Sequence, residues 1–84
     1  MTEEKPPLAD AELAIMQFLW ESGEQTARQI REALYGEDTP SNNATVQKLL
    51  QRLEHKGYVE RDRSQFVHSF RALVTRQQYS NRQL

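Results

Sequence analysis

The chain of 84 residues contains no cysteine, which excludes disulfide bonds and thiolate metal ligands. With only two histidines, a metal site is not expected either. No apolar run approaches the ~18 residues that a membrane-spanning helix requires, and the N-terminus MTEEKPPL lacks the basic-then-apolar order of a signal peptide. We therefore expect a cytoplasmic protein that has no membrane partner and needs no metal or other cofactor.

Sequence signals of catalysis are missing as well. The chain has no H-E-x-x-H run and no set of residue types arranged as nucleophile, base and orienting group. Its three glycines, Gly23, Gly36 and Gly57, each follow a predicted helix, so they do not form a phosphate-binding loop. The sequence predicts a protein that is not an enzyme.

The charges are divided unequally between the two halves of the chain. Residues 1–40 hold three basic and nine acidic side chains, a balance of −6, whereas residues 41–84 hold eight basic and three acidic ones, a balance of +5. A cationic half of this kind favours a polyanionic partner more strongly than the net charge of −1 suggests.

Apolar periodicity and end signals predict three helices in the first two thirds of the chain. The first begins at 9–10, with Glu12 at its positive end, and stops before Gly23. The second spans about 27–35, because Thr26 and Gln29 have the spacing of a capping box. The third spans 42–56, with Ser41 or Asn42 as its cap. Its apolar stripe consists of Val46, Leu49, Leu50 and Leu53.

Two β-like runs follow, at 58–62 and 66–73, with residues 63–65 as the tip of a hairpin. Thr75 and Gln78 repeat the capping-box spacing and predict a last helix that is still running at the end of the chain. The order predicts a mainly α fold with a small β-hairpin (α+β). It is a winged helix-turn-helix, a three-helix core with a two- to three-stranded wing. Residues 1–7 are expected to be a flexible lead-in, residues 8–75 the winged helix domain, and residues 76–84 the start of the C-terminal helix.

In this architecture the third helix enters a major groove of double-stranded DNA and the wing, here 61–66, lies along the phosphate backbone. The polar side of helix 42–56 has residue types suited to bases, since amides pair with adenine, lysine with guanine, and small apolar groups pack on thymine methyls. Its first-turn amides at 42–43 are expected to hold a phosphate. The predicted DNA-binding residues are Asn42, Asn43, Ala44, Thr45, Gln47, Lys48, Gln51, Arg52, Arg61 and Arg63.

Two motifs carry a resemblance to a known family. They are L-x-x-A-E-x-x-x-M-x-x-L-W at 8–20 and the more specific T-V-Q-x-L-L-x-R-L-x-x-K-G at 45–57. Together they resemble the bacterial penicillinase-repressor family, which includes β-lactamase, methicillin-resistance and copper-transport repressors. The resemblance covers about residues 8–80. It departs from the family at Gln65, where the wing usually has glycine, at Ala72, where proline often follows the second strand, and at Asn43, which replaces a common proline.

The resemblance implies a transcriptional repressor that binds a pseudo-palindromic operator as a homodimer, with one winged helix on each half-site. Family members place dimerisation helices after the winged domain, so residues 76–84 are expected to lead into such a region, and this chain alone is expected to be a monomer. The alternative is a winged helix that serves only protein–protein contact, with helix 42–56 as its interaction face. The two differ in salt dependence, because phosphate neutralisation makes affinity fall steeply with salt.

Overall fold

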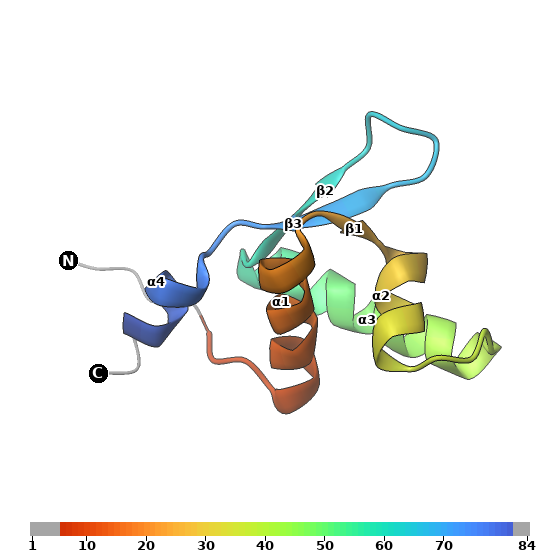
Figure 1. Cartoon of the computed structure of the whole chain (residues 1–84), viewed down its shortest axis with the longest axis horizontal. Coiled ribbons are helices and arrows are strands. Elements are labelled where there is room, and N and C mark those ends of the chain that lie inside the picture. Colours follow the sequence, from red (N-terminus) through yellow and green to blue (C-terminus); the bar gives the residue numbers. More distant parts are fainter. Residues whose placement is uncertain (1–5, 82–84) are drawn as a thin grey trace.

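Four helices and three short strands make up the described part of the chain, residues 6–81, in a computed structural model (Figure 1). In chain order they are α1 (Asp10–Ser22), β1 (Gln25–Thr26), α2 (Ala27–Leu34), α3 (Pro40–Lys56), β2 (Val59–Asp62), β3 (Ser69–Ala72) and α4 (Arg76–Asn81). The predicted order of helices and hairpin is confirmed. Predictions for residues 1–5 of the lead-in and for residues 82–84 of the last helix lie outside the described residues.

Both predicted capping boxes are present. The Gln29 backbone N–H donates to the Thr26 hydroxyl at 3.1 Å, and the Thr26 N–H donates to the Gln29 side chain at 2.8 Å. Likewise, the Gln78 backbone N–H donates to the Thr75 hydroxyl at 3.0 Å, and the Thr75 N–H donates to the Gln78 side chain at 2.8 Å. These local bonds satisfy helix-end donors, which is why they could be predicted from residue spacing.

The start of α3 differs from the prediction, since neither Ser41 nor Asn42 is its cap. The cap is Thr39, whose hydroxyl accepts the Asn42 backbone N–H at 3.0 Å. Pro40 takes the first helical position, where its fixed φ suits the helix and its missing N–H costs nothing. Helix α3 therefore begins two residues earlier than predicted, and residues 41–43 belong to its first turn.

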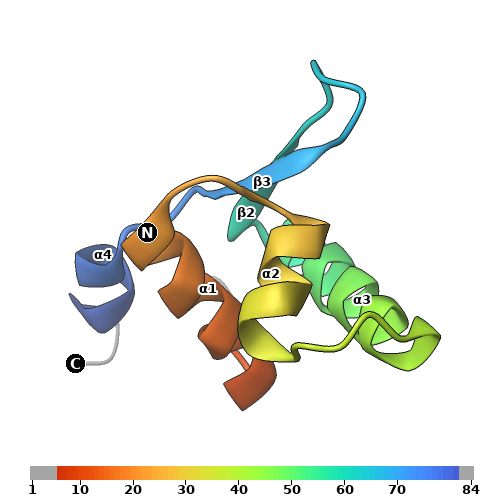
Figure 2. The ribbon, with the colours of Figure 1, turned by 45° about the vertical axis from the view of Figure 1, so that its right-hand side comes forward.

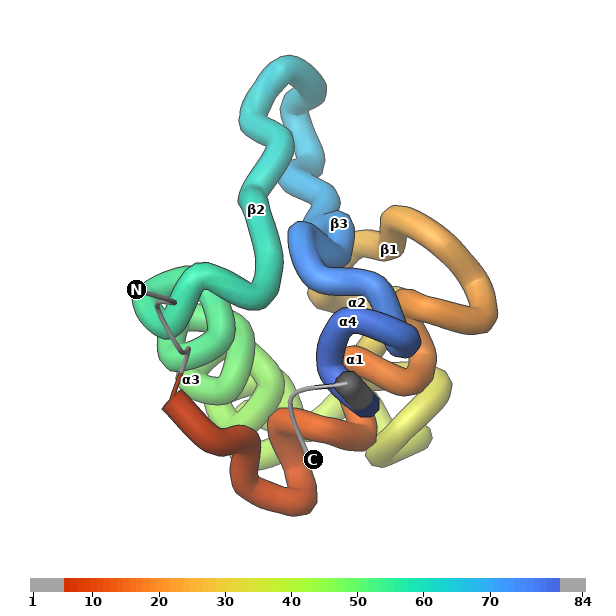
Figure 3. The backbone as a smooth tube through the Cα atoms, turned by 90° about the vertical axis from the view of Figure 1, so that its left-hand side faces the viewer, coloured from red at the N-terminus to blue at the C-terminus, as the bar shows by residue number. Residues whose placement is uncertain are grey.

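Strands β2 and β3 form a hairpin, residues 59–72, which we call the wing and which projects from the helical body (Figure 3). The prediction that residues 66–68 belong to the second strand is wrong, because pairing stops at Asp62 and Ser69. The Asp62 carboxylate accepts the Ser64 N–H at 2.9 Å and so starts a turn instead of a longer ladder. Residues 63–68 form the loop that we call the wing tip.

A third strand, β1, completes an antiparallel sheet in the order β1-β3-β2. Gln25 lies opposite Phe70 and Thr26 opposite Ser69, so the residues that start α2 are tied to the wing. Figure 2 shows β1 crossing from the end of α1 to α2 beside β3. The sheet thus fixes the wing relative to the helices.

The core lies between the first three helices and the base of the wing. The predicted apolar stripe of α3 is buried, and Leu50 and Leu53 are fully buried. Because this stripe faces the core, the opposite face of α3 lies in solvent. The other fully or nearly fully buried apolar side chains are Ile15, Met16, Leu19, Ile30, Tyr58, Val59, Phe70 and Val74.

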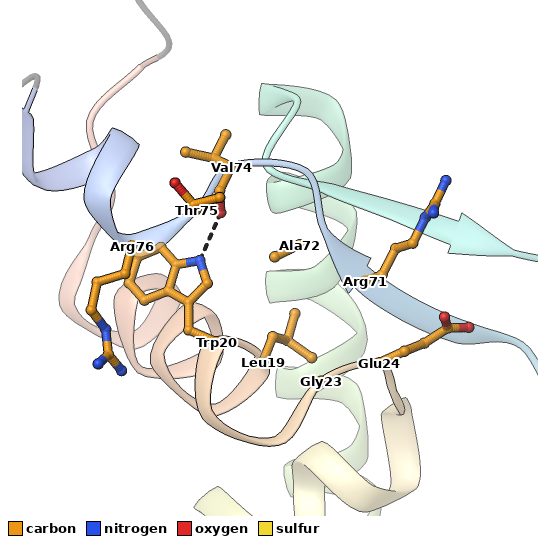
Figure 4. Close-up of a pocket in the computed structure, with 9 residues that line it drawn as sticks. All are labelled: Leu19, Trp20, Gly23, Glu24, Arg71, Ala72, Val74, Thr75 and Arg76. Carbon is orange, nitrogen blue, oxygen red and sulfur yellow. Dashed lines mark hydrogen bonds between the residues drawn. The ribbon is translucent and has the colours of Figure 1, made fainter.

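Trp20 connects α1 to the segment that leads into α4 (Figure 4). Its indole N–H donates to the Val74 carbonyl at 2.7 Å, and its ring lies 6.0 Å from that of Tyr79, centroid to centroid. Tyr79 also meets the buried Tyr58 ring edge-on. The tryptophan therefore packs between α1 and the segment before α4, and its polar atom is satisfied.

Candidate nucleic-acid interface

The side of α3 opposite the core presents an exposed surface that we call the polar face. It consists of Ala44, Thr45, Gln47, Lys48, Gln51, Arg52 and His55. Within the described residues, Gln47, Lys48 and Gln51 make no side-chain hydrogen bond or ion pair. Because the helix is anchored by its buried stripe, these side chains point outward from a fixed support and are available to a ligand.

Asn42 and Asn43, which were predicted to approach bases, are engaged within the protein. The Asn42 side-chain amide donates to the Glu37 carbonyl at 3.0 Å, and that of Asn43 donates to the Asp38 carboxylate at 2.7 Å. Their backbone N–H groups donate to the side chain and carbonyl of Thr39. Both backbone donors that were expected to hold a phosphate therefore already have an acceptor in Thr39. The side chains of Asn42 and Asn43 stabilise the α2–α3 connection through their hydrogen bonds to Glu37 and Asp38.

The two predicted wing arginines have different surroundings. Arg61 reaches back to α3, where its guanidinium lies 3.4 Å from the Glu54 carboxylate and 4.9 Å from the centre of the Phe70 ring. Its side chain is only 21% exposed, so it braces the wing against α3. Arg63 is exposed at the start of the wing tip. Of the two, only Arg63 has an exposed side chain that makes no hydrogen bond or ion pair within the described residues.

Sequence reasoning missed a hollow between α3 and the wing, about 260 Å³ in volume. Gln47 from α3 and Arg28 from α2 line it on one side, and Phe66, Val67 and His68 from the wing tip on the other. Arg28 has a 79% exposed side chain, 3.6 Å from Glu32. No sequence signal could have revealed this hollow, because nothing in local spacing places the wing tip opposite Gln47.

A buried ion pair fixes the C-terminal end of α3 against α1. The Lys56 ammonium lies 2.7 Å from the Glu12 carboxylate, whose side chain is only 2% exposed, and also donates to the Pro7 carbonyl at 3.1 Å. The same carboxylate oxygen accepts the Ala9 backbone N–H at 2.9 Å. The sequence had indicated only a first-turn acid, because the pair joins residues 44 positions apart.

The pKa of Glu12 reflects these surroundings. Burial alone would raise it, but the hydrogen bonds from Lys56 and Ala9 and the charges of Lys56 and Arg52 outweigh burial. The net result is a pKa below the ordinary value of 4.5. The folded protein therefore favours the ionised carboxylate.

This lowered pKa predicts a specific pH dependence of stability. The contribution of ionised Glu12 is fully present above pH 4.5 and is lost as the pH falls through the lower folded pKa. We expect the free energy of unfolding to fall with pH in that window more steeply for the unmodified protein than for Glu12→Gln. Urea unfolding at a series of pH values measures the difference, and parallel curves for the two proteins would contradict it.

A second hollow, about 410 Å³, lies beside Trp20, between the end of α1 and the segment that leads from β3 into α4 (Figure 4). Its two arginines are already paired, Arg71 with Glu60 and Arg76 with Glu21. Arg76 also lies 5.7 Å from the centre of the Trp20 ring. With both cations compensated, this hollow offers less to a polyanion than the polar face of α3 does.

Within residues 6–81, no group of three or more histidine and carboxylate side chains is arranged to hold a metal ion. Nor does any helix in that range have the length and apolar character needed to cross a membrane.

Comparison with known proteins agrees with the geometry. The family model described as "Penicillinase repressor" matches residues 8–84. No curated protein gives a significant match to the chain.

Proposed function

Because the chain belongs to the penicillinase repressor family, whose members are winged-helix DNA-binding transcriptional repressors, we propose that α3 enters a major groove of its operator. The family is not enzymatic, and its partners are DNA operators. The observation that carries the proposal is the polar face of α3, which is exposed and rigidly backed by the core. A major groove about 12 Å wide accepts one such helix.

The N-terminal half of α3 is the part that we assign to bases. Gln47 has an amide suited to adenine and Lys48 an ammonium suited to guanine, while Ala44 and the methyl group of Thr45 are suited to thymine methyls. Gln51 follows one turn later and is assigned to the backbone side. This assignment leaves out Asn42 and Asn43 as direct base readers, because their amides already hold the α2–α3 connection.

Arg52 and Arg63 are assigned to phosphates on the two flanks of the helix. Arg52 lies on the exposed side of α3 with Lys48, along a hollow that both line, and Arg63 lies on the wing tip. Arg61 acts indirectly in this proposal, since its contacts with Glu54 and Phe70 set the position of the wing.

We further propose that two copies occupy a pseudo-palindromic operator, with one winged helix, residues 8–75, on each half-site. Residues 76–84 then lead toward the dimerising region, and the 84-residue chain by itself is a monomer that binds one half-site weakly. Linkage of two binding units raises affinity through effective concentration, which a single unit lacks. We also propose a cytoplasmic location, which is usual for repressors of this family.

A salt titration tests the DNA-binding proposal. A duplex is selected from a random-sequence pool by the 84-residue protein, and its dissociation constant is measured at several salt concentrations. We expect log affinity to fall linearly with log salt, and Arg52→Ala to reduce the slope by about 0.9, the value of one phosphate contact. Lys48→Ala should cost about 1–3 kcal/mol of binding and relax selectivity at one base pair.

Arg76→Ala is the matched control, because it also removes an exposed cation but lies beside Trp20, away from α3. This variant should leave the salt slope of the affinity and the base-pair selectivity unchanged. If no duplex is enriched and affinity is independent of salt, α3 does not bind DNA and the protein-contact alternative takes its place.

A further inference from the structure

The wing tip exposes two apolar side chains that no fold contact explains. Phe66 is 101% exposed and Val67 58% exposed, whereas Phe70, a few residues later on β3, is 2% exposed and fills the core. Scattered apolar residues are ordinary on a protein surface. The position of this pair, at the end of a projecting hairpin, is what separates it from such residues (Figure 1).

Phe66 belongs to the part of the wing tip that borders α3. With Val67 and His68 it lines the same hollow as Gln47 of the polar face and Arg28 of α2. The wing tip therefore flanks the helix that we assign to the major groove. Figure 3 shows the tip extending well beyond the body, so that it can reach a groove next to the one that α3 occupies.

The charges around the tip favour a nucleic acid on this side. The tip sequence RSQFVH, residues 63–68, carries Arg63 and no carboxylate. The acidic residues near the wing line a separate hollow with Arg71 instead, namely Glu24, Glu60 and Asp62. The two sides of the wing thus differ, because no carboxylate lines the hollow beside the apolar tip.

We propose that Phe66 enters the minor groove of the operator as an apolar wedge, next to the major groove that holds α3. This inference rests on the proposed function. A phenyl ring makes no favourable polar contact with a phosphate, and α3 already fills the major groove in this proposal. The minor groove remains, and its width of about 6 Å admits a single side chain. Apolar side chains inserted there partly unstack a base step and bend the duplex.

The wedge predicts selectivity at a position that α3 does not touch. Unstacking is least costly at pyrimidine–purine steps such as TA and CA/TG, and most costly in stiff A-tracts. We therefore expect selected duplexes to carry a flexible step at a fixed distance from the base pairs that Lys48 reads. Arg63 beside the wedge holds the adjoining phosphate.

The test compares the unmodified protein, Phe66→Ala, Phe66→Leu and Leu73→Ala on the duplex selected from the random pool. Leu73 is a half-exposed apolar residue beyond the wing, so its replacement controls for loss of apolar surface. Affinity is measured together with end-to-end energy transfer, which reports bending, and with 2-aminopurine fluorescence at the flexible step, which reports unstacking.

We expect Phe66→Ala to lower affinity about tenfold, in the range for loss of an aromatic contact to bases. It should also abolish the bend and the fluorescence rise, while leaving the salt slope and the thermal unfolding temperature unchanged. Phe66→Leu should stay within about threefold of the unmodified protein, because leucine also acts as a wedge. Leu73→Ala should behave as the unmodified protein does.

Equal affinity and bending for Phe66→Ala and the unmodified protein would overturn the wedge and leave DNA binding by α3 intact. A loss of self-association in Phe66→Ala without DNA, measured by sedimentation, would also overturn it and assign the tip to a contact between two copies. If the unmodified protein selects no duplex, the proposed function fails first and the wedge with it.

Discussion

Replacing Lys56 with methionine is expected to lower the free energy of unfolding by about 3–5 kcal/mol at pH 7, the usual cost of removing one partner from a buried ion pair. The Glu12 carboxylate, 2% exposed, would be left with only the Ala9 N–H as a hydrogen-bond donor. A domain of this length has a total stability of about 4–13 kcal/mol, so this loss is a large share of it.

Replacing the acidic partner, Glu12, should lower the free energy of unfolding by less. In Glu12→Gln the amide oxygen still accepts the Ala9 N–H, and Lys56, whose side chain is 24% exposed, turns its ammonium to water. We expect a loss of about 1.5–3 kcal/mol, the range of one hydrogen bond to a charged group.

A double-mutant cycle measured by urea unfolding separates the pair from its surroundings. Glu12→Gln with Lys56→Met should be more stable than Lys56→Met alone, because no unpaired charge then remains buried. The ion pair matters for function because it holds the C-terminal end of α3 to α1. Equal losses for the two single variants would show that the carboxylate is not effectively buried in solution.

Replacing Leu50 with alanine is expected to cost about 2–5 kcal/mol of stability, since the side chain is fully buried and its removal leaves a cavity. Leu50 belongs to the stripe that seats α3 on α1, α2 and the wing. Thermal and urea unfolding measure the loss. Lys48→Ala and Gln51→Ala on the exposed face of the same helix serve as controls and should each stay within about 0.5 kcal/mol.

The same three variants distinguish the two faces of α3 by function. At a temperature where Leu50→Ala remains folded, its DNA affinity should match that of the unmodified protein, because Leu50 touches no solvent. Lys48→Ala should show the opposite pattern, with intact stability and weakened binding. A stable Leu50→Ala, or an unstable Lys48→Ala, would mean that α3 is rotated relative to the structure.

The sequence by itself determined whatever depends on neighbours along the chain. The capping boxes at Thr26 and Thr75 could be predicted because both partners of each bond lie within three residues. The buried stripe of α3 could be predicted because its apolar side chains repeat with the helical period. These local signals, together with two motifs, were sufficient for the winged-helix fold and for the exposed face of α3.

Some local details were nevertheless mistaken, because neighbouring residues competed for one role. Ser41, Asn42 and Thr39 are all good helix caps, and the structure uses Thr39 because Pro40 suits the first helical position. Residues 66–68 have strand-forming composition, yet the turn started by Asp62 ends the ladder before them. Composition alone does not rank such alternatives, since they differ by only small free energies.

Tertiary structure decided what depends on residues far apart in sequence. Strand β1 exists because Gln25 and Thr26 pair with β3 more than 40 positions later, and two residues carry no periodicity of their own. The burial of Glu12, the engagement of Arg61 by Glu54 and the placement of Phe66 opposite Gln47 likewise follow from packing. The sequence specified which side chains α3 exposes, whereas only the folded chain decided which cations remain available and which wing residue lies beside them.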